Sequence, residues 1–92
     1  MYGQELLQMM KNFIDKKIEA EPFSFDFPGR LAFVYKDFRK ENPALCDFLQ
    51  KDMPDYCAAY DPDPAGEPDL LDDEQLREKV KGVYEKAVAL QK

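Results

Sequence analysis

Apolar residues recur at steps of three and four near the start of this chain, which is the spacing of one face of an α-helix. Charged residues, among them Lys11, Asp15 and Glu19, fall between them. This pattern predicts an amphipathic helix over residues 4–20. Its apolar positions are Leu6, Leu7, Met10, Phe13, Ile14 and Ile18.

Two prolines, Pro22 and Pro28, follow this segment, and a proline interrupts a helix interior because its ring removes the backbone N–H. Three phenylalanines alternate with polar residues between them, at Phe23, Phe25 and Phe27. The alternation is short and no partner strand is evident, so we predict a turn over residues 21–26. A second helix would then begin with Asp26 as its cap and Pro28 in its first turn. Its buried positions would be Leu31, Val34, Tyr35 and Phe38.

A third helix is predicted from Asn42 and Pro43, because asparagine is a good N-cap and proline is favoured at the first helical position. Pro54 lies inside the pattern, so we expect a kink or a break near Asp52. The helical spacing is kept by Leu45, Cys46, Leu49, Met53, Tyr56, Cys57 and Tyr60.

Residues 61–71 contain three prolines and a glycine, a density that excludes regular structure. A last helix is predicted over residues 72–90, with Asp72 or Asp73 as its cap. Four amphipathic helices with short connections predict an all-α, four-helix bundle, and 92 residues suit a single domain over residues 1–92. The buried stripe of the last helix would be Leu76, Val80, Val83, Ala87 and Leu90.

The negative charge of the chain is concentrated in one stretch, residues 52–74, which contains no Lys or Arg. The chain has 19 acidic and 13 basic residues, so the remainder holds 10 acids and all 13 bases. A mildly basic body therefore carries one strongly negative segment. The nine acids of that segment are Asp52, Asp55, Asp61, Asp63, Glu67, Asp69, Asp72, Asp73 and Glu74.

The composition also excludes several classes of function. A net charge of −6 disfavours binding to nucleic acid or to an anionic membrane, and favours a partner with a basic surface. The chain has no histidine and no Gly-rich phosphate loop, so we expect neither an enzyme nor a cofactor. Without a secretory signal or an apolar run of ~20 residues, we expect a cytoplasmic protein. Cys46 and Cys57 would then be reduced thiols that pack as small apolar residues.

The acidic segment allows several interpretations. It could be a solvated loop followed by a well-capped helix. It could dock on some other basic protein, as an adaptor. The third is calcium: counted from Asp61, residues 61–72 place Asp63, Gly66, Asp69 and Asp72 where an EF-hand loop has ligands or its glycine. Ala65 and Pro68 depart from that pattern, and no resident metal is predicted.

A polyanionic surface suits a nuclease especially well, because the substrate channel of a nuclease is basic. Spaced carboxylates would occupy that channel as an imitation of phosphates, with charge-assisted hydrogen bonds to Arg and Lys. Tyr60 would be an aromatic neighbour of the acids, or alternatively a core residue that closes the third helix. The candidate partner-binding residues are Asp52, Asp55, Tyr60, Asp61, Asp63, Glu67, Asp69, Asp72 and Asp73.

Three short motifs carry a resemblance to a known family: FIDKKIEAEPFS at residues 13–24, YDPD at residues 60–63 and LREKVKGVYEK at residues 76–86. In these motifs the chain resembles the colicin D immunity family, small four-helix proteins that neutralise bacterial toxins cleaving transfer RNA. The resemblance implies that an acidic surface covers the basic active site of such a toxin. It assigns this role to Asp61 and Asp63, and to Asp52 and Asp55 on the preceding helix.

Overall fold

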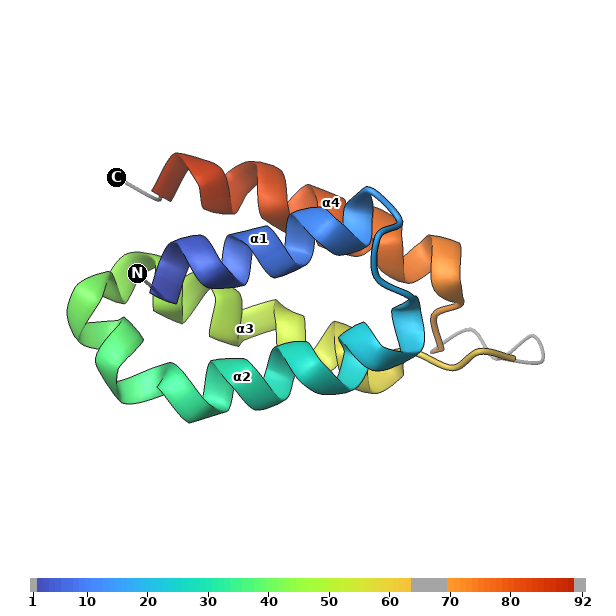
Figure 1. Ribbon diagram of the computed structural model, residues 1–92, viewed down its shortest axis with the longest axis horizontal. Helices are drawn as coiled ribbons and strands as arrows, with labels where there is room; N and C mark the ends of the chain where they lie inside the picture. Colours follow the sequence, from blue (N-terminus) through green and yellow to red (C-terminus); the bar gives the residue numbers. More distant parts are fainter. Residues whose placement is uncertain (1, 64–69, 91–92) are drawn as a thin grey trace.

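The protein is a bundle of four antiparallel α-helices in its computed structural model (Figure 1), which describes residues 2–63 and 70–90. The predicted all-α, four-helix fold is therefore confirmed. None of the helices in these ranges is long and apolar enough to cross a membrane. In chain order the helices are α1 (Tyr2–Ile14), α2 (Ala20–Glu41), α3 (Pro43–Ala59) and α4 (Asp73–Leu90).

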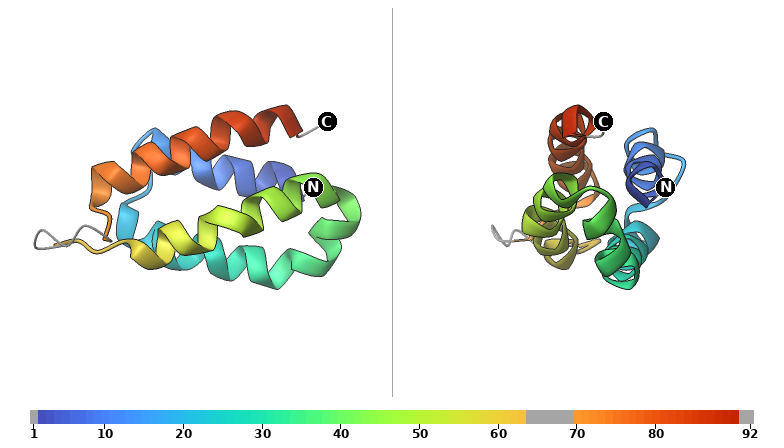
Figure 2. Two further views of the ribbon diagram at one scale, coloured as in Figure 1. Left: turned by 180° about the vertical axis from the view of Figure 1, so that it is seen from behind. Right: turned by 90° about the vertical axis from the view of Figure 1, so that its left-hand side faces the viewer.

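The helices run up and down the long axis of a molecule that measures 40 × 22 × 19 Å. Viewed along that axis, they occupy the corners of a square, with α1 between α2 and α4 and with α3 on the far side (Figure 2). The α1–α2 connection lies at the same end of the bundle as the passage from α3 to α4. The α2–α3 connection lies at the other end, with the start of α1 and the end of α4.

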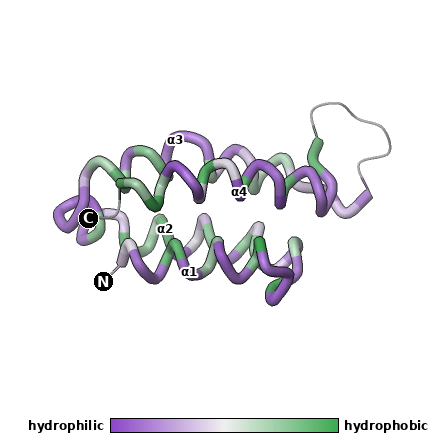
Figure 3. The backbone as a smooth tube through the Cα atoms, turned by 90° about the horizontal axis from the view of Figure 1, so that it is seen from above, coloured by the Kyte–Doolittle hydropathy of each residue, from purple (hydrophilic) through white to green (hydrophobic). Residues whose placement is uncertain are grey.

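The core is apolar throughout, and apolar segments alternate with polar ones along every helix (Figure 3). Its largest side chains are phenylalanines without solvent exposure. The Phe13 and Phe23 rings stack with centroids 4.4 Å apart, and the Phe27 ring lies 5.3 Å from that of Phe23. This cluster joins α1 to the beginning of α2. The fully buried large residues are Phe13, Phe23, Phe27, Phe38, Leu6, Met10, Leu31, Leu45, Leu49, Met53, Leu76 and Val80.

The predicted start of the second helix is wrong, because α2 begins at Ala20 and runs through residues 21–26. Pro22 lies in the first turn, where its missing N–H has no intrahelical partner to lose. Helical spacing then places Phe23 and Phe27 on one buried face and leaves Phe25 72% exposed on the other. A turn or a strand would have left this apolar face without its partners in the core.

The predicted cap and first turn of this helix are also corrected. Asp26 lies inside α2 and is exposed, whereas Glu19 occupies the N-cap position without a side-chain capping hydrogen bond. Pro28 lies inside the helix as well. Because Pro28 has no N–H, it cannot make the usual bond to the carbonyl of Ser24. The burial of the phenylalanines offsets the loss of that bond.

Helix α1 ends earlier than predicted, at Ile14 rather than near Ala20. Lys16 adopts a left-handed conformation with φ of 65°. Its N–H donates to the Phe13 carbonyl at 3.0 Å, and the Lys17 N–H donates to the Asn12 carbonyl at 2.8 Å. These two bonds form a Schellman motif, in which position C′ is usually glycine. A lysine at this position closes the helix at a cost in backbone strain.

The start of α3 is confirmed as predicted. The Asn42 side-chain oxygen accepts a hydrogen bond from the Leu45 N–H at 3.1 Å, and its amide donates to the Leu90 carbonyl at 3.0 Å. Asn42 therefore caps α3 and ties it to the end of α4.

Pro54 does not split the helix, since α3 is continuous from Pro43 to Ala59.

Alanine substitutions should separate the two faces of α2. Phe23→Ala should lower the free energy of unfolding by about 3–5 kcal/mol, because it removes a fully buried ring. Phe25→Ala should change it by no more than about 0.5 kcal/mol, because that ring is exposed. Denaturation in guanidinium measures both values. Equal losses would mean that both rings are buried on the same face, which a helix over these residues does not allow.

A glycine at the end of α1 should stabilise the protein. Lys16→Gly should raise the free energy of unfolding by about 0.5–1 kcal/mol, because glycine adopts positive φ without strain. Lys17→Gly is the matched control: it removes the same charge at the next exposed residue, and it should be neutral or destabilising. Thermal unfolding of the two variants gives the comparison. An increase for Lys17→Gly alone would contradict the Schellman assignment.

Candidate functional site

Much of the predicted acidic site lies where the chain passes from α3 to α4, at one end of the bundle (Figure 1). The Asp61 N–H donates to the Leu71 carbonyl at 2.9 Å, and the Leu71 N–H donates to the Ala59 carbonyl at 2.8 Å. These bonds form a single parallel bridge between Tyr60 and Leu71. The two chain segments are therefore fixed to each other at the end of the bundle. We call this region the acidic neck, made of Tyr60, Asp61, Asp63, Asp72 and Asp73.

Tyr60 joins the two sides of the neck through its side chain. Its hydroxyl donates to a carboxylate oxygen of Asp73 at 2.7 Å. Burial raises the pKa of Tyr60 to about 12, and the hydrogen bond to Asp73 and the nearby carboxylates of Glu21 and Asp61 act in the same direction. All of these effects oppose a negative charge on the phenol. Tyr60 also packs against the core, as its alternative interpretation predicted.

Asp72 caps α4, in agreement with the sequence. Its carboxylate accepts the Gln75 N–H at 2.8 Å, while the Gln75 side chain accepts the Asp72 N–H at 3.0 Å. This reciprocal arrangement is a capping box, and the negative charge is favourable beside the positive end of the helix dipole. The carboxylates of Asp72 and Asp73 thus already accept hydrogen bonds within the protein, and a bound partner would have to contact them alongside these bonds.

Asp61 and Asp63 form a local turn of their own. The Asp61 carboxylate accepts the Asp63 N–H at 2.9 Å, as in an Asx turn. Only one carboxylate oxygen of Asp61 is used in this bond, and Asp63 is exposed. Asp61 therefore keeps one carboxylate oxygen outside this bond, and neither residue forms an ion pair with the described bases.

The other predicted residues are not all brought to the neck. Asp55 is exposed on α3, one turn before its end, whereas Asp52 lines a hollow between α3 and α4 together with Lys79 and Lys86. Asp52 thus shares its surroundings with basic side chains. Glu67 and Asp69 lie outside the described residues.

The described acids of residues 52–74 form no ion pair with the described bases. Across residues 2–63 and 70–90 the structure contains three ion pairs, and all of them use acids outside residues 52–74. The pairs are Lys11–Asp15, Arg30–Glu5 and Arg39–Asp47. The negative charge at the neck is therefore not neutralised by direct contact with these bases.

Basic residues limit the negative surface on the side of α1. Arg77 donates from Nε to the Phe13 carbonyl at 3.1 Å, and its guanidinium lies 4.7 Å from the Phe13 ring centroid. A cation at this place interacts favourably with the negative end of the α1 dipole. Arg77 also lines a hollow with Lys16, Lys81 and Glu74. The acid Glu74 thus lies among bases.

The two cysteines and the possible metal ligands are the remaining candidates for chemistry among the described residues. Burial raises the pKa of the Cys57 thiol to about 12 and also raises the pKa of the Cys46 thiol, so both are poor nucleophiles. In the two described ranges, no three His, Cys, Asp or Glu side chains are placed to hold one metal ion. Several positions of the proposed calcium loop, including Asp69, fall outside those ranges.

Sequence reasoning missed two features beside the neck. Glu21 lies close enough to influence the Tyr60 hydroxyl, because α2 begins at Ala20 and not after Asp26. A groove of about 450 Å³ also opens between α2 and α3, and the exposed ring of Phe25 lines it. Pro22 was the available signal, since a proline in the first turn marks a helix start.

Comparison with models of known protein families, with curated proteins and with solved structures found no match to this chain.

The hydrogen bond between Tyr60 and Asp73 should have a measurable pH signature. Tyr60→Phe should lower the free energy of unfolding by about 1 kcal/mol at neutral pH, because the bond and a satisfied carboxylate are lost. A raised phenol pKa favours folding at pH below the unfolded value near 10, and that benefit is lost as the pH rises toward 12.

The gap in stability between the wild type and Tyr60→Phe should therefore shrink between pH 10 and pH 12. Denaturation series at several pH values measure the gap. Tyr35→Phe is the control, since it removes a hydroxyl from a partly buried tyrosine on α2, away from the neck. A gap for Tyr60→Phe that stays constant over this pH range would contradict the assigned contact.

Proposed function

We propose that this chain is an immunity protein, which binds and neutralises a nuclease toxin that cleaves transfer RNA. It would place the acidic neck over the basic active site of the toxin and imitate the phosphates of the substrate. The observation that carries the proposal is that the described acids of residues 52–74 form no ion pair with the described bases. Such a surface attracts a cationic partner.

The architecture fits an inhibitor that acts by occlusion. Backbone hydrogen bonds join the two sides of the neck, and the Asp63 N–H holds the Asp61 carboxylate, so part of this surface is ordered before binding. Asp61 and Asp63 are the proposed anchors, with Asp55 on the adjoining helix. The resemblance of three short motifs to the colicin D immunity family points to the same assignment. Asp72 and Asp73 would contribute charge while they keep their structural bonds.

The same surface would also serve an adaptor for another basic protein, which is the second candidate function. Both functions use unpaired carboxylates, and they differ only in the partner. An immunity gene is expected directly beside the gene of its toxin. The nuclease domain encoded there is therefore the partner to purify for the test.

The decisive variant is Asp61→Asn combined with Asp63→Asn. Asparagine keeps the oxygen that accepts the Asp63 N–H, so the turn should survive while two charges disappear. Binding to the nuclease domain should weaken by about 2–5 kcal/mol, because cationic partners in the complex would be left unpaired. Titration calorimetry gives the affinity, and cleavage of transfer RNA at equimolar inhibitor gives the inhibition.

A matched control removes two charges from the other end of the bundle. Asp37→Asn combined with Asp47→Asn changes exposed carboxylates on α2 and α3, one of them in an exposed pair with Arg39. This variant should bind and inhibit within about twofold of the wild type, because exposed pairs contribute little. Unimpaired binding of the Asp61 and Asp63 variant would reject these two residues as anchors, and no inhibition by the wild-type protein would reject the immunity function.

A further inference from the structure

The groove between α2 and α3 is apolar and opens directly beside the acidic neck. Its lining includes Phe25 and Pro28 from α2 and Pro54, Cys57 and Ala58 from α3. The small side chains of Cys57 and Ala58 leave the volume of about 450 Å³ open. Phe25 stands at its side with 72% of its surface exposed to solvent. An exposed aromatic ring next to an open apolar groove is a typical anchor site for a partner.

The rim of the groove accepts hydrogen bonds and carries negative charge. Glu21, Ser24 and Tyr60 line it, and Asp61 follows Tyr60 directly. The Ser24 carbonyl cannot receive the usual helical bond, because the residue four positions later is Pro28. Glu21 itself lines the groove, and Asp61 adjoins the lining residues Tyr60 and Pro62 in the chain. Donors with positive charge are therefore favoured at the edge of an apolar site.

We infer that the groove binds a segment of the basic partner in which an apolar side chain adjoins an arginine or lysine. The apolar side chain would pack against Phe25, Pro28 and Ala58. The cationic head would reach Glu21, the Ser24 carbonyl or the neck. The inference rests on the proposed function only because it takes the partner to be positively charged. The apolar contact in the groove is an addition that phosphate mimicry does not require.

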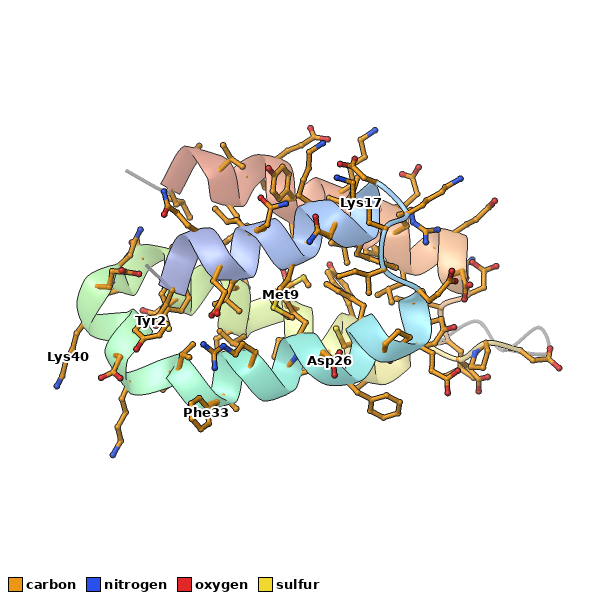
Figure 4. All side chains as sticks on the ribbon, viewed as in Figure 1. Tyr2, Met9, Lys17, Asp26, Phe33 and Lys40 are labelled. Atoms are coloured by element: carbon orange, nitrogen blue, oxygen red, sulfur yellow. The ribbon has the colours of Figure 1, made fainter. Side chains whose placement is uncertain are left out.

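A second exposed phenylalanine on α2 provides the internal control. Phe33 is 82% exposed and projects away from the other helices (Figure 4). It does not line the groove, and the Arg30 guanidinium lies 5.5 Å from its ring centroid. Phe25→Ser and Phe33→Ser therefore remove the same exposed side chain from one helix, and only Phe25→Ser changes the groove.

Two short peptides test the inference without the toxin. One alternates three arginines with three leucines, and the other alternates three arginines with three serines, so their charges are equal. Titrations followed by NMR of the ¹⁵N-labelled protein give both affinities. The leucine peptide should bind the wild type at least fivefold more tightly, with shifts at Phe25 and Ala58. Phe25→Ser should reduce the ratio to below twofold, and Phe33→Ser should leave it unchanged.

Equal affinities of the two peptides, no binding of either at millimolar concentration, or an equal loss in Phe33→Ser would overturn the groove assignment. The peptide titrations and the nuclease assay test the groove and the proposed function separately. Binding of the leucine peptide together with failure to inhibit the nuclease would remove the immunity function and keep the groove. Inhibition of the nuclease together with equal peptide affinities would keep the immunity function and remove the groove.

Discussion

The stacking of Phe13 on Phe23 is the contact on which the arrangement of the functional end depends. It joins the last turn of α1 to the first turn of α2, and burial of each ring contributes about 2–3 kcal/mol. Because Phe23 must face the core, α2 has to begin before it, at Ala20. Because α2 begins this early, Glu21 lies near Tyr60, and Phe25 is exposed beside the groove. The packing of Phe13 on Phe23 in the core thus determines both the position of Glu21 near the neck and the position of Phe25 beside the groove.

The sequence was sufficient for the number of helices, for their apolar faces and for the caps at Asn42 and Asp72, because each of these depends on residues within a few positions of one another. It was not sufficient for the start of α2. Pro28 and the alternating phenylalanines predict a turn locally, and the packing of Phe23 against Phe13 of the preceding helix favours a helix instead. Lys16 is a similar case, since nothing local indicates that a lysine adopts positive φ.

The negative charge of the candidate site could be predicted from the sequence, but the positions of its acidic side chains could not. The composition of residues 52–74 predicts a negative surface. In the structure, however, the described acids of this stretch lie in different surroundings. Asp52 lies among lysines on one side, while Asp72 and Asp73 are used to cap α4 and to hold Tyr60. Local roles for some acids do not explain why the three ion pairs of the described chain all use acids outside residues 52–74. The interpretation as a solvated loop accounts for Asp72, and it leaves the exposed Asp61 and Asp63 turn without a purpose.

Charge and apolar contact would contribute differently to recognition at this end of the molecule. Exposed carboxylates act over a distance of roughly one Debye length, about 8–10 Å, and they mainly accelerate and orient the encounter. Every basic partner would benefit from them, so they discriminate poorly. An apolar groove acts only at contact and mainly slows dissociation. A protein that must distinguish one basic nuclease from another therefore needs something like the Phe25 groove beside its acids, because phosphate mimicry alone would serve them all.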